Sequence, residues 1–146
     1  MICLVQRVTQ AKVEINQKKV AQIGPGLVIL TAFKPQDSAQ TLQKMVKKLL
    51  HYRLFADKTG KMNLNVQQTN GQLLIVPQFT LAANTKSGLR PSFSTSAPPA
   101  QASLWFKQFV AQITQHYRCP QTGQFGADMQ VSLTNDGPVT FWLEID

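Results

Sequence analysis

The sequence contains few of the residues that most enzymes use for catalysis. Among 146 residues there are two histidines, His51 and His116, and two cysteines, Cys3 and Cys119. Each histidine falls near the end of a predicted helix, where solvated or dipole-facing histidines are common. The cysteines match no zinc signature and are too few for a disulfide framework. The seven acidic residues form no DxD or ExxH pattern, so we expect no metal and no other cofactor.

Long apolar runs are also missing. No segment approaches the roughly 20 apolar residues that a membrane-spanning helix needs. The first eight residues are interrupted by Gln6 and Arg7 and do not form a basic-then-apolar leader. These two absences predict a cytoplasmic protein that does not associate with a membrane.

Negative charge is scarce, since 15 basic residues face 7 acidic ones, which gives a net charge of +8. Such an excess favours a polyanionic partner, with nucleic acid as the first candidate and an anionic membrane surface as the second. The alternative is that the charge only keeps the protein soluble. Charged residues make up only 15% of the chain, which is a hint that a partner chain covers part of the surface.

Hydrophobic periodicity predicts one α+β domain over residues 1–146. One amphipathic helix follows a cap at Asp37 or Ser38, and a second spans 100–117 with Leu104, Trp105 and Phe109 in its buried stripe. The strands outnumber the helices and do not alternate regularly with them, which predicts a mainly antiparallel sheet. Strands are expected at 1–8, 11–15, 20–23, 27–33, 53–55, 73–81, 129–133 and 139–145.

Two local sequences are unusual. The first is Pro-Gln-Phe-Thr-Leu at 77–81, at the end of a predicted strand, and the second is Asn-Asp-Gly-Pro-Val-Thr at 135–140. Each also has an ordinary interpretation, because threonine is a good strand former and Gly-Pro commonly forms a turn.

Taken together, these segments resemble the D-aminoacyl-tRNA deacylase family, which carries an S-Q-F-T-L motif and an N-x-G-P-x-T motif. The resemblance covers almost the whole chain, in the order and spacing of the family. Matching segments also occur at 5–8, 23–27, 60–64, 90–93 and 122–129.

The resemblance implies a compact, barrel-like α+β fold with two main helices, and a homodimer with an active site at the interface. It implies that Gln78, Phe79 and Thr80 form the catalytic segment. It also implies that Gly137 and Pro138, joined by a cis bond in the family, reach into the partner's pocket. Further substrate-binding positions implied by the resemblance are Pro77, Phe125 and Met129, with the last two near the terminal adenosine.

The implied activity is hydrolysis of the ester that joins a D-amino acid to the terminal ribose of tRNA. Backbone N–H groups of Gln78, Phe79 and Thr80 can stabilise the tetrahedral oxyanion. We rank first a substrate-assisted route, in which the ribose 2′-hydroxyl helps to activate water or to attack. Nucleophilic attack by Thr80 ranks second, because the sequence shows no base that would activate its hydroxyl.

Chiral selection is expected to follow from the carbonyl groups of Gly137 and Pro138, which would clash with an L side chain. Glycine has no side chain to reject, so the resemblance implies action on glycyl-tRNA, including glycine mischarged on tRNA-Ala. Phosphate contacts are expected from a set of basic residues, although the lysines of the first helix can equally form a solvated face. The set is Lys44, Lys47, Lys48, Lys86 and Arg90.

The chain departs from the family pattern at Pro77, where the family has serine. A P-Q-x-T-L motif is found in a related animal branch that removes L-alanine from a non-cognate tRNA. Phe79 and Val139 agree instead with the D-specific family. Two other interpretations remain open: an RNA-binding protein without turnover, and an esterase that acts on small substrates.

Overall fold

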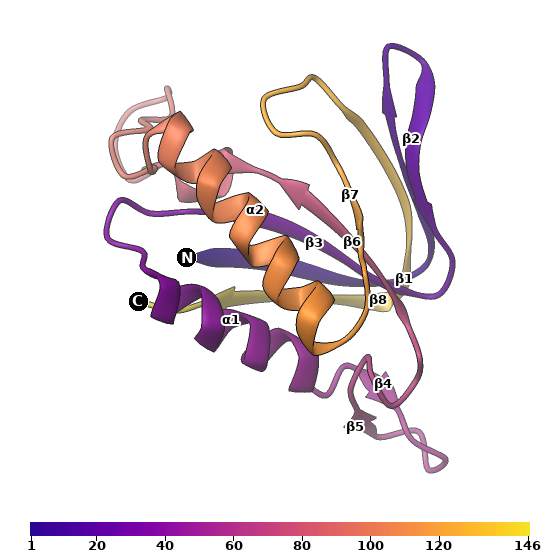
Figure 1. Cartoon of the computed structure of the whole chain (residues 1–146). Coiled ribbons are helices and arrows are strands. Elements are labelled where there is room, and N and C mark those ends of the chain that lie inside the picture. Colours follow the sequence, from indigo (N-terminus) through magenta and orange to yellow (C-terminus); the bar gives the residue numbers. More distant parts are fainter.

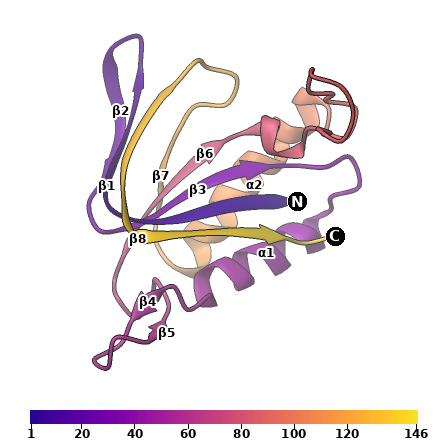
Figure 2. The ribbon, with the colours of Figure 1, turned by 180° about the vertical axis from the view of Figure 1, so that it is seen from behind.

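The fold is organised around one long strand, β1 (Ile2–Ile15), which pairs antiparallel with three others. The computed structural model describes all residues from 1 to 146. The partners of β1 are β2 (Lys18–Ile23), β3 (Gly26–Ala32) and β8 (Gln130–Glu144). Because β2 pairs with one half of β1 and β3 with the other, the sheet curls around β1 (Figure 2). The domain is therefore α+β with a nearly closed, barrel-like sheet, as predicted.

The sheet is mixed, so the prediction of a mainly antiparallel sheet was only partly right. Strand β6 (Gln72–Pro77) runs parallel to β3, and β7 (Gln121–Thr122) runs parallel to β6. Parallel neighbours need a crossover connection. Helix α1 (Ala39–His51) lies in the first crossover with the small β4 (Phe55–Ala56) and β5 (Met62–Leu64) ladder, and α2 (Pro99–His116) forms the second (Figure 1).

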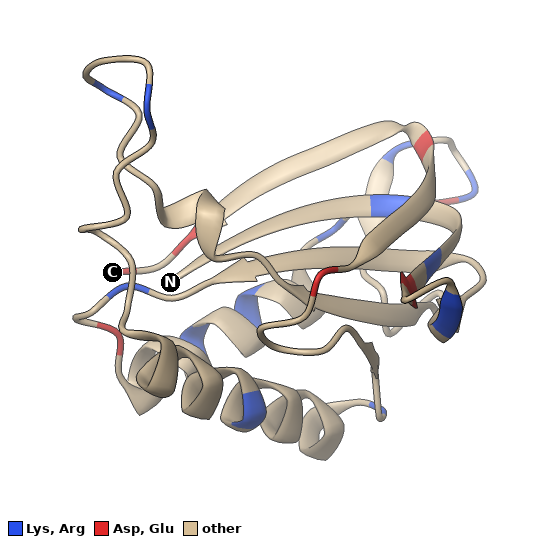
Figure 3. Cartoon of the chain, turned by 90° about the horizontal axis from the view of Figure 1, so that it is seen from above, with Lys and Arg blue, Asp and Glu red and all other residues tan.

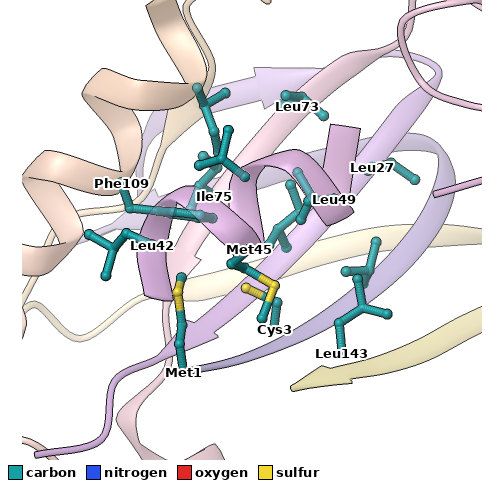
Figure 4. Packing of buried hydrophobic residues seen from close by; sticks show 14 of the residues in the cluster. Met1, Cys3, Leu27, Leu42, Met45, Leu49, Leu73, Ile75, Phe109 and Leu143 are labelled. Atoms are coloured by element: carbon teal, nitrogen blue, oxygen red, sulfur yellow. The ribbon is translucent and has the colours of Figure 1, made fainter. Parts of the chain in front are cut away.

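Apolar side chains alternate along the central strands and fill two cores. On β3, Leu27 and Ile29 belong to the core beneath the helices, whereas Val28 belongs to the core inside the curl. Figure 4 shows side chains of both helices meeting those of the strands in the first core. The second core consists of Val8, Ala11, Val13, Ala21, Ile23, Val28, Leu74 and Val76.

The two candidate caps of α1 have different partners. The Ser38 side chain accepts a hydrogen bond from the Thr41 N–H and forms a capping box, which makes it the N-cap. Asp37 instead binds the buried N-terminal ammonium of Met1 at 2.6 Å and accepts the Lys34 N–H through its other oxygen. Asp37 therefore fastens the start of β1 to the loop that precedes α1.

Several local predictions were wrong. The two strands expected at 1–8 and 11–15 form the single strand β1, those expected at 129–133 and 139–145 form the single strand β8, and the strand expected at 53–55 is the short β4 at Phe55–Ala56. The strand expected over 73–81 ends at Pro77 and is followed by a 3₁₀ helix, η1 (Phe79–Ala82). Pro77 has no N–H to continue the ladder, and the last hydrogen bond to the sheet runs from the Gln78 N–H to the Thr31 carbonyl (2.7 Å). Leu104, expected in the core, is 52% exposed, while Phe106 is buried in its place. Neither α1 nor α2 combines the length and apolar character that crossing a membrane requires.

Candidate active site

A cavity of about 430 Å³ lies at the carboxyl ends of the parallel strands β3 and β6. Ligands commonly bind beyond the carboxyl ends of parallel strands, where side chains and free backbone groups converge. The walls come from the ends of both strands, the first turn of α2, and the connection between β7 and β8. Five residues predicted from the sequence line this one cavity: Pro77, Gln78, Phe79, Phe125 and Met129.

Thr80 lies just outside the lining. Its hydroxyl oxygen accepts a hydrogen bond from the Gln78 side-chain amide at 2.5 Å, and both side chains lie on the same turn. No imidazole or carboxylate is hydrogen-bonded to this hydroxyl among the contacts of the chain. The arrangement orients Thr80 through Gln78 and supplies no base that would activate it as a nucleophile.

The backbone of the same turn offers two of the three expected N–H donors. The Gln78 N–H is already bonded to Thr31, so it is not free to stabilise an oxyanion. Phe79 and Thr80 are the first residues of η1, and their N–H groups have no acceptor within this helix. Phe79 is also 56% exposed at the cavity rim and packs against Phe93, with ring centroids 5.0 Å apart and ring planes tilted by 55°.

The opposite wall depends on a close approach at Gly123. Its N–H donates to the Ile75 carbonyl (2.9 Å), which holds the connection after β7 against β6. A Cβ atom at Gly123 would lie 2.7 Å from the Met129 sulfur. The absence of a side chain at Gly123 therefore leaves room for the Met129 side chain in the cavity wall. Phe125 is fixed by packing against Phe106, with ring centroids 6.4 Å apart.

Gly137 and Pro138, predicted as substrate-binding residues, do not line the cavity of their own chain. They lie on β8, where the pairing with β1 is irregular between Gln6 and Val8, and both are exposed. The peptide bond between them is cis. Asn135 closes this segment: its side-chain oxygen accepts the Val139 N–H at 2.8 Å, and its amide donates to the Thr140 hydroxyl at 2.9 Å.

Arg7 holds the segment to the body of the domain. Its Nε donates to the Asp136 carbonyl at 3.0 Å and lies 3.2 Å from the Asp136 carboxylate. One terminal nitrogen, Nη1, donates to the Leu54 carbonyl at 2.8 Å. The side chain is 14% exposed, so its guanidinium is a partly buried anchor. Sequence analysis placed Arg7 only within a matching segment, and nothing in its spacing indicated this contact.

Two of the remaining candidate groups, Cys3 and His51, are in structural environments. Burial raises the pKa of the Cys3 thiol to about 12, which leaves it protonated. His51 contacts the Lys47 carbonyl at the end of α1 (2.8 Å). No group of three or more His, Cys, Asp or Glu side chains is arranged to hold a metal ion. Basic positions occur on both helices (Figure 3), and Lys86 and Arg90 lie in the exposed connection before α2.

Comparison with known proteins gives a match over nearly the whole chain. The family described as D-Tyr-tRNA(Tyr) deacylase matches residues 4–144. The D-aminoacyl-tRNA deacylase of Hydrogenovibrio crunogenus is 60% identical over 99% of this chain and 99% of its own length. That of Mannheimia succiniciproducens is 55% identical over 99% of this chain and all of its own length.

Two solved structures share the fold. The c-Myc DNA Unwinding Element Binding Protein superposes with a TM-score of 0.96 at 37% identity, covering 100% of this chain and 99% of that one. A probable eukaryotic D-amino acid tRNA deacylase superposes with a TM-score of 0.86 at 19% identity, covering 99% and 98%. The second likeness supports the fold alone.

Proposed function

Because the chain belongs to the D-Tyr-tRNA(Tyr) deacylase family, whose members are hydrolases acting on ester bonds, we propose that its cavity is a chiral editing site. The substrate is D-aminoacyl-tRNA, and the products are free D-amino acid and tRNA. Glycyl-tRNA, including glycine mischarged on tRNA-Ala, belongs to the same substrate class because glycine has no side chain to exclude. The observation that carries the proposal is the gathering of Pro77, Gln78, Phe79, Phe125 and Met129 around one cavity.

The proposed chemistry relies on the backbone and on the substrate. The N–H groups of Phe79 and Thr80 stabilise the oxyanion that forms at the ester carbon. The 2′-hydroxyl of the terminal ribose assists the attack, since no imidazole or carboxylate contacts Thr80. Thr80 and Gln78 hold the turn in shape by their mutual hydrogen bond. Phe125 and Met129 form the part of the wall that accepts the terminal adenosine.

The proposed chiral filter requires two subunits. Gly137 and Pro138 are exposed and lie outside their own cavity, so in a homodimer they are free to enter the cavity of the partner. Trp142 is 50% exposed on the same strand, and a second copy covering β8 would bury it. The carbonyl groups of this segment then exclude an L side chain by direct clash.

The tRNA itself is proposed to bind across the basic surface, in the cytoplasm. Lys86 and Arg90 are exposed, form no ion pair, and lie in a connection, residues 83–98, without an acidic residue. The Asn84–Ser92 bridge closes this connection, and the tilted contact between the Phe79 and Phe93 rings joins it to the cavity rim. Lys44, Lys47 and Lys48 supply a second basic surface on α1.

A direct test compares deacylation of matched D-Tyr-tRNA and L-Tyr-tRNA by the purified protein with a chelator present. We expect rapid loss of the D-ester only, because the filter excludes the L side chain, and no effect of the chelator. Loss of both esters would refute the filter, and activity that disappears with chelator would show that a metal is required.

A nucleic-acid-binding protein without turnover is the second candidate. It is favoured by the name of one similar structure, the c-Myc DNA Unwinding Element Binding Protein, and by the net charge of +8. Both candidates bind tRNA, so only turnover separates them. Stoichiometric binding of D-Tyr-tRNA without release of tyrosine would support this second function.

Removing the anchor at Arg7 should disturb the filter. We expect Arg7→Ala to lower kcat/KM for D-Tyr-tRNA by about 100-fold, because a displacement of about 1 Å in a positioning segment has effects of this size. Rejection of the L-ester should weaken as well. The kcat/KM of Arg7→Lys should fall between those of the wild type and Arg7→Ala. Lysine keeps the positive charge, but one ammonium group cannot make the several hydrogen bonds of the planar guanidinium.

The matched control is Arg53→Ala, which removes an exposed arginine without a hydrogen bond or ion pair. Thermal melts of all variants at one protein concentration separate a local effect from unfolding. Wild-type rates and wild-type rejection in Arg7→Ala would show that the anchor does not position the filter.

A further inference from the structure

A second cavity, of about 750 Å³, lies at the amino ends of the parallel strands β3 and β6, whereas the candidate active site lies at their carboxyl ends. The two cavities share no lining residue. We call the second one the amino-end cavity. Its polar walls come from the chain just before β3 and β6, from the end of α2, and from the segments of β1 and β8 where their pairing is irregular. The polar side chains that matter here are those of Thr9, Asn70, Gln72, Arg118 and Asp136.

Arg118 carries the unpaired charge of the amino-end cavity. Its Nη1 donates to the Asn70 carbonyl at 3.2 Å, and its guanidinium carbon lies 5.3 Å from the centre of the Tyr117 ring. The residue is partly buried and forms no ion pair. The other charged residue of the wall, Asp136, is already paired with Arg7 at 3.2 Å. These contacts fix the guanidinium and leave its Nε and Nη2 as free donors.

The neutral groups in the same wall are also donors. The side chains of Thr9 and Asn70 take part in no hydrogen bond within the chain. Gln72 accepts the Gly24 N–H through its side-chain oxygen at 2.6 Å, which leaves its amide nitrogen as a donor. The cavity therefore offers a fixed guanidinium, two amide nitrogens and a hydroxyl, while its one carboxylate is already paired. Such a set of donors suits the anionic oxygens of a phosphodiester.

The position of the amino-end cavity indicates which phosphodiester it can reach. Asp136 lies in its wall, and the next two residues, Gly137 and Pro138, are those proposed to enter the partner's active site. The amino-end cavity of one subunit then lies beside the active-site cavity of the other. Within one chain the two cavities lie at opposite ends of β6, whose six residues extend over about 20 Å. The nearer substrate is therefore the one bound by the partner.

We propose that the amino-end cavity binds a phosphodiester group near the 3′ end of the tRNA whose aminoacyl-adenosine occupies the partner's active site. This inference rests on the proposed function and its homodimer, and it adds a binding site that the opposite subunit contributes. Arg118 donates Nε and Nη2 to the phosphate oxygens, with Asn70 and Thr9 as further donors. Both subunits thus hold one RNA end, so the filter and the substrate are positioned together.

The first test compares D-tyrosyl-adenosine, which has no phosphodiester, with D-tyrosyl-CCA, which has two. For Arg118→Ala we expect kcat/KM on D-tyrosyl-CCA to fall by about 10-fold, the effect of losing a charge-assisted hydrogen bond. The change should lie mainly in KM, because the phosphate is remote from the reacting ester. Rates on D-tyrosyl-adenosine should stay at the wild-type level, and Arg118→Lys should restore part of the loss.

A methylphosphonate linkage, which carries no charge, tests the phosphate itself. On D-tyrosyl-CCA with both linkages replaced, the wild type and Arg118→Ala should react equally. Lys107→Ala, which removes an exposed lysine without an ion pair on α2, is the matched control and should change neither rate. Thermal melts of all variants show whether losing the Arg118 contacts to the chain alters the fold.

Three results would overturn the phosphate contact. Equal losses on D-tyrosyl-adenosine and D-tyrosyl-CCA would mean that Arg118 acts through the fold. Unchanged rates on both would mean that it does not contact the substrate. A loss that persists on the methylphosphonate substrate would assign the contact to the sugars or bases of the RNA.

The contribution from the opposite subunit is tested with heterodimers whose chains carry different affinity tags. One chain carries Ala102→Trp, which fills its active-site cavity, since Ala102 lines that cavity. Arg118→Ala on this blocked chain should lower turnover of D-tyrosyl-CCA, because only the other active site is open. The same substitution on the open chain should have no effect. The reverse pattern, or failure to isolate any dimer that carries both tags, would overturn the proposal.

Failure of the proposed function is distinguishable, because the wild type would then release tyrosine from neither substrate. In that case binding of fluorescein-labelled CCA and of its methylphosphonate form tests the cavity without turnover. The wild type should bind the charged RNA more tightly, and Arg118→Ala should weaken binding of that RNA alone. Equal binding of the two RNAs by the wild type would overturn the inference.

Discussion

A D-tyrosyl ester on tRNA whose terminal ribose lacks the 2′-hydroxyl should be released about 100- to 10,000-fold more slowly than the natural ester, the range typical of a positioned acid–base group. The reason is the composition of the cavity rim, where the turn at 78–80 offers backbone N–H groups and no imidazole or carboxylate contacts the Thr80 hydroxyl. The measurement is single-turnover release of tyrosine, and it should show a loss in the chemical step with little change in binding.

Two controls make this result specific. The uncatalysed hydrolysis of each ester is measured in parallel, because removal of the 2′-hydroxyl also alters the intrinsic reactivity of the ester. Thr80→Ala should lower turnover but leave residual activity, since it removes the hydroxyl that accepts the Gln78 side-chain hydrogen bond and, in the proposed mechanism, removes no nucleophile. Full activity on the deoxy ester, together with complete inactivity of Thr80→Ala and a trapped acyl-Thr80 species, would establish Thr80 as the nucleophile instead.

Gly26→Ala should destabilise the domain by about 3 kcal/mol or more, at the upper end of the cost of overpacking. A Cβ atom at Gly26 would lie 1.9 Å from the Gln72 carbonyl oxygen and 2.6 Å from the Gln72 nitrogen. Both are backbone atoms where β3 and β6 begin their parallel pairing, so no side-chain rotation can relieve the clash. For a chain of this size, the midpoint temperature of thermal unfolding should fall by roughly 6–12 °C.

Gly24→Ala is the matched control, because its Cβ atom would come no closer than 3.7 Å to another atom, the Gln72 Oε1. Urea unfolding at one fixed protein concentration should therefore separate the two alanine variants clearly. If both variants unfolded at the same urea concentration, the strands would be able to separate at Gly26, and the close approach would not limit stability.

The sequence allowed the elements to be predicted but not all of their pairings. The continuous apolar run along 27–33 identified β3, because a strand that is buried on both faces is apolar throughout. Helical spacing after the cap at Asp37 or Ser38 identified α1, because burial on one face of a helix leaves a periodic pattern. The parallel pairing of β3 with β6 depends on which edges meet after α1 crosses over, and periodicity carries no information about that. The end of β6 could have been placed at Pro77, since a residue without an N–H cannot continue a central ladder.

The candidate site was predicted by resemblance rather than by pattern. Pro77, Gln78 and Phe79 lie more than forty residues before Phe125 and Met129, and only the fold brings them to one cavity. The contacts of Arg7 join segments that lie far apart in the sequence, so no local pattern could have indicated them. Leu104 was misplaced because both sides of α2 carry apolar residues, which blurs its buried stripe.

The pairing of β1 with β8 has a consequence for biosynthesis. Ile2 lies opposite Glu144 and Val5 opposite Phe141, so the first strand made receives its neighbour on this edge only from the last. At about 5–20 residues per second, a ribosome leaves that edge without its partner for several seconds, while β3 can already occupy the other edge. An unpaired strand edge is prone to associate with other chains, so the nascent protein is expected to need protection from aggregation until β8 has been synthesised and has paired with β1.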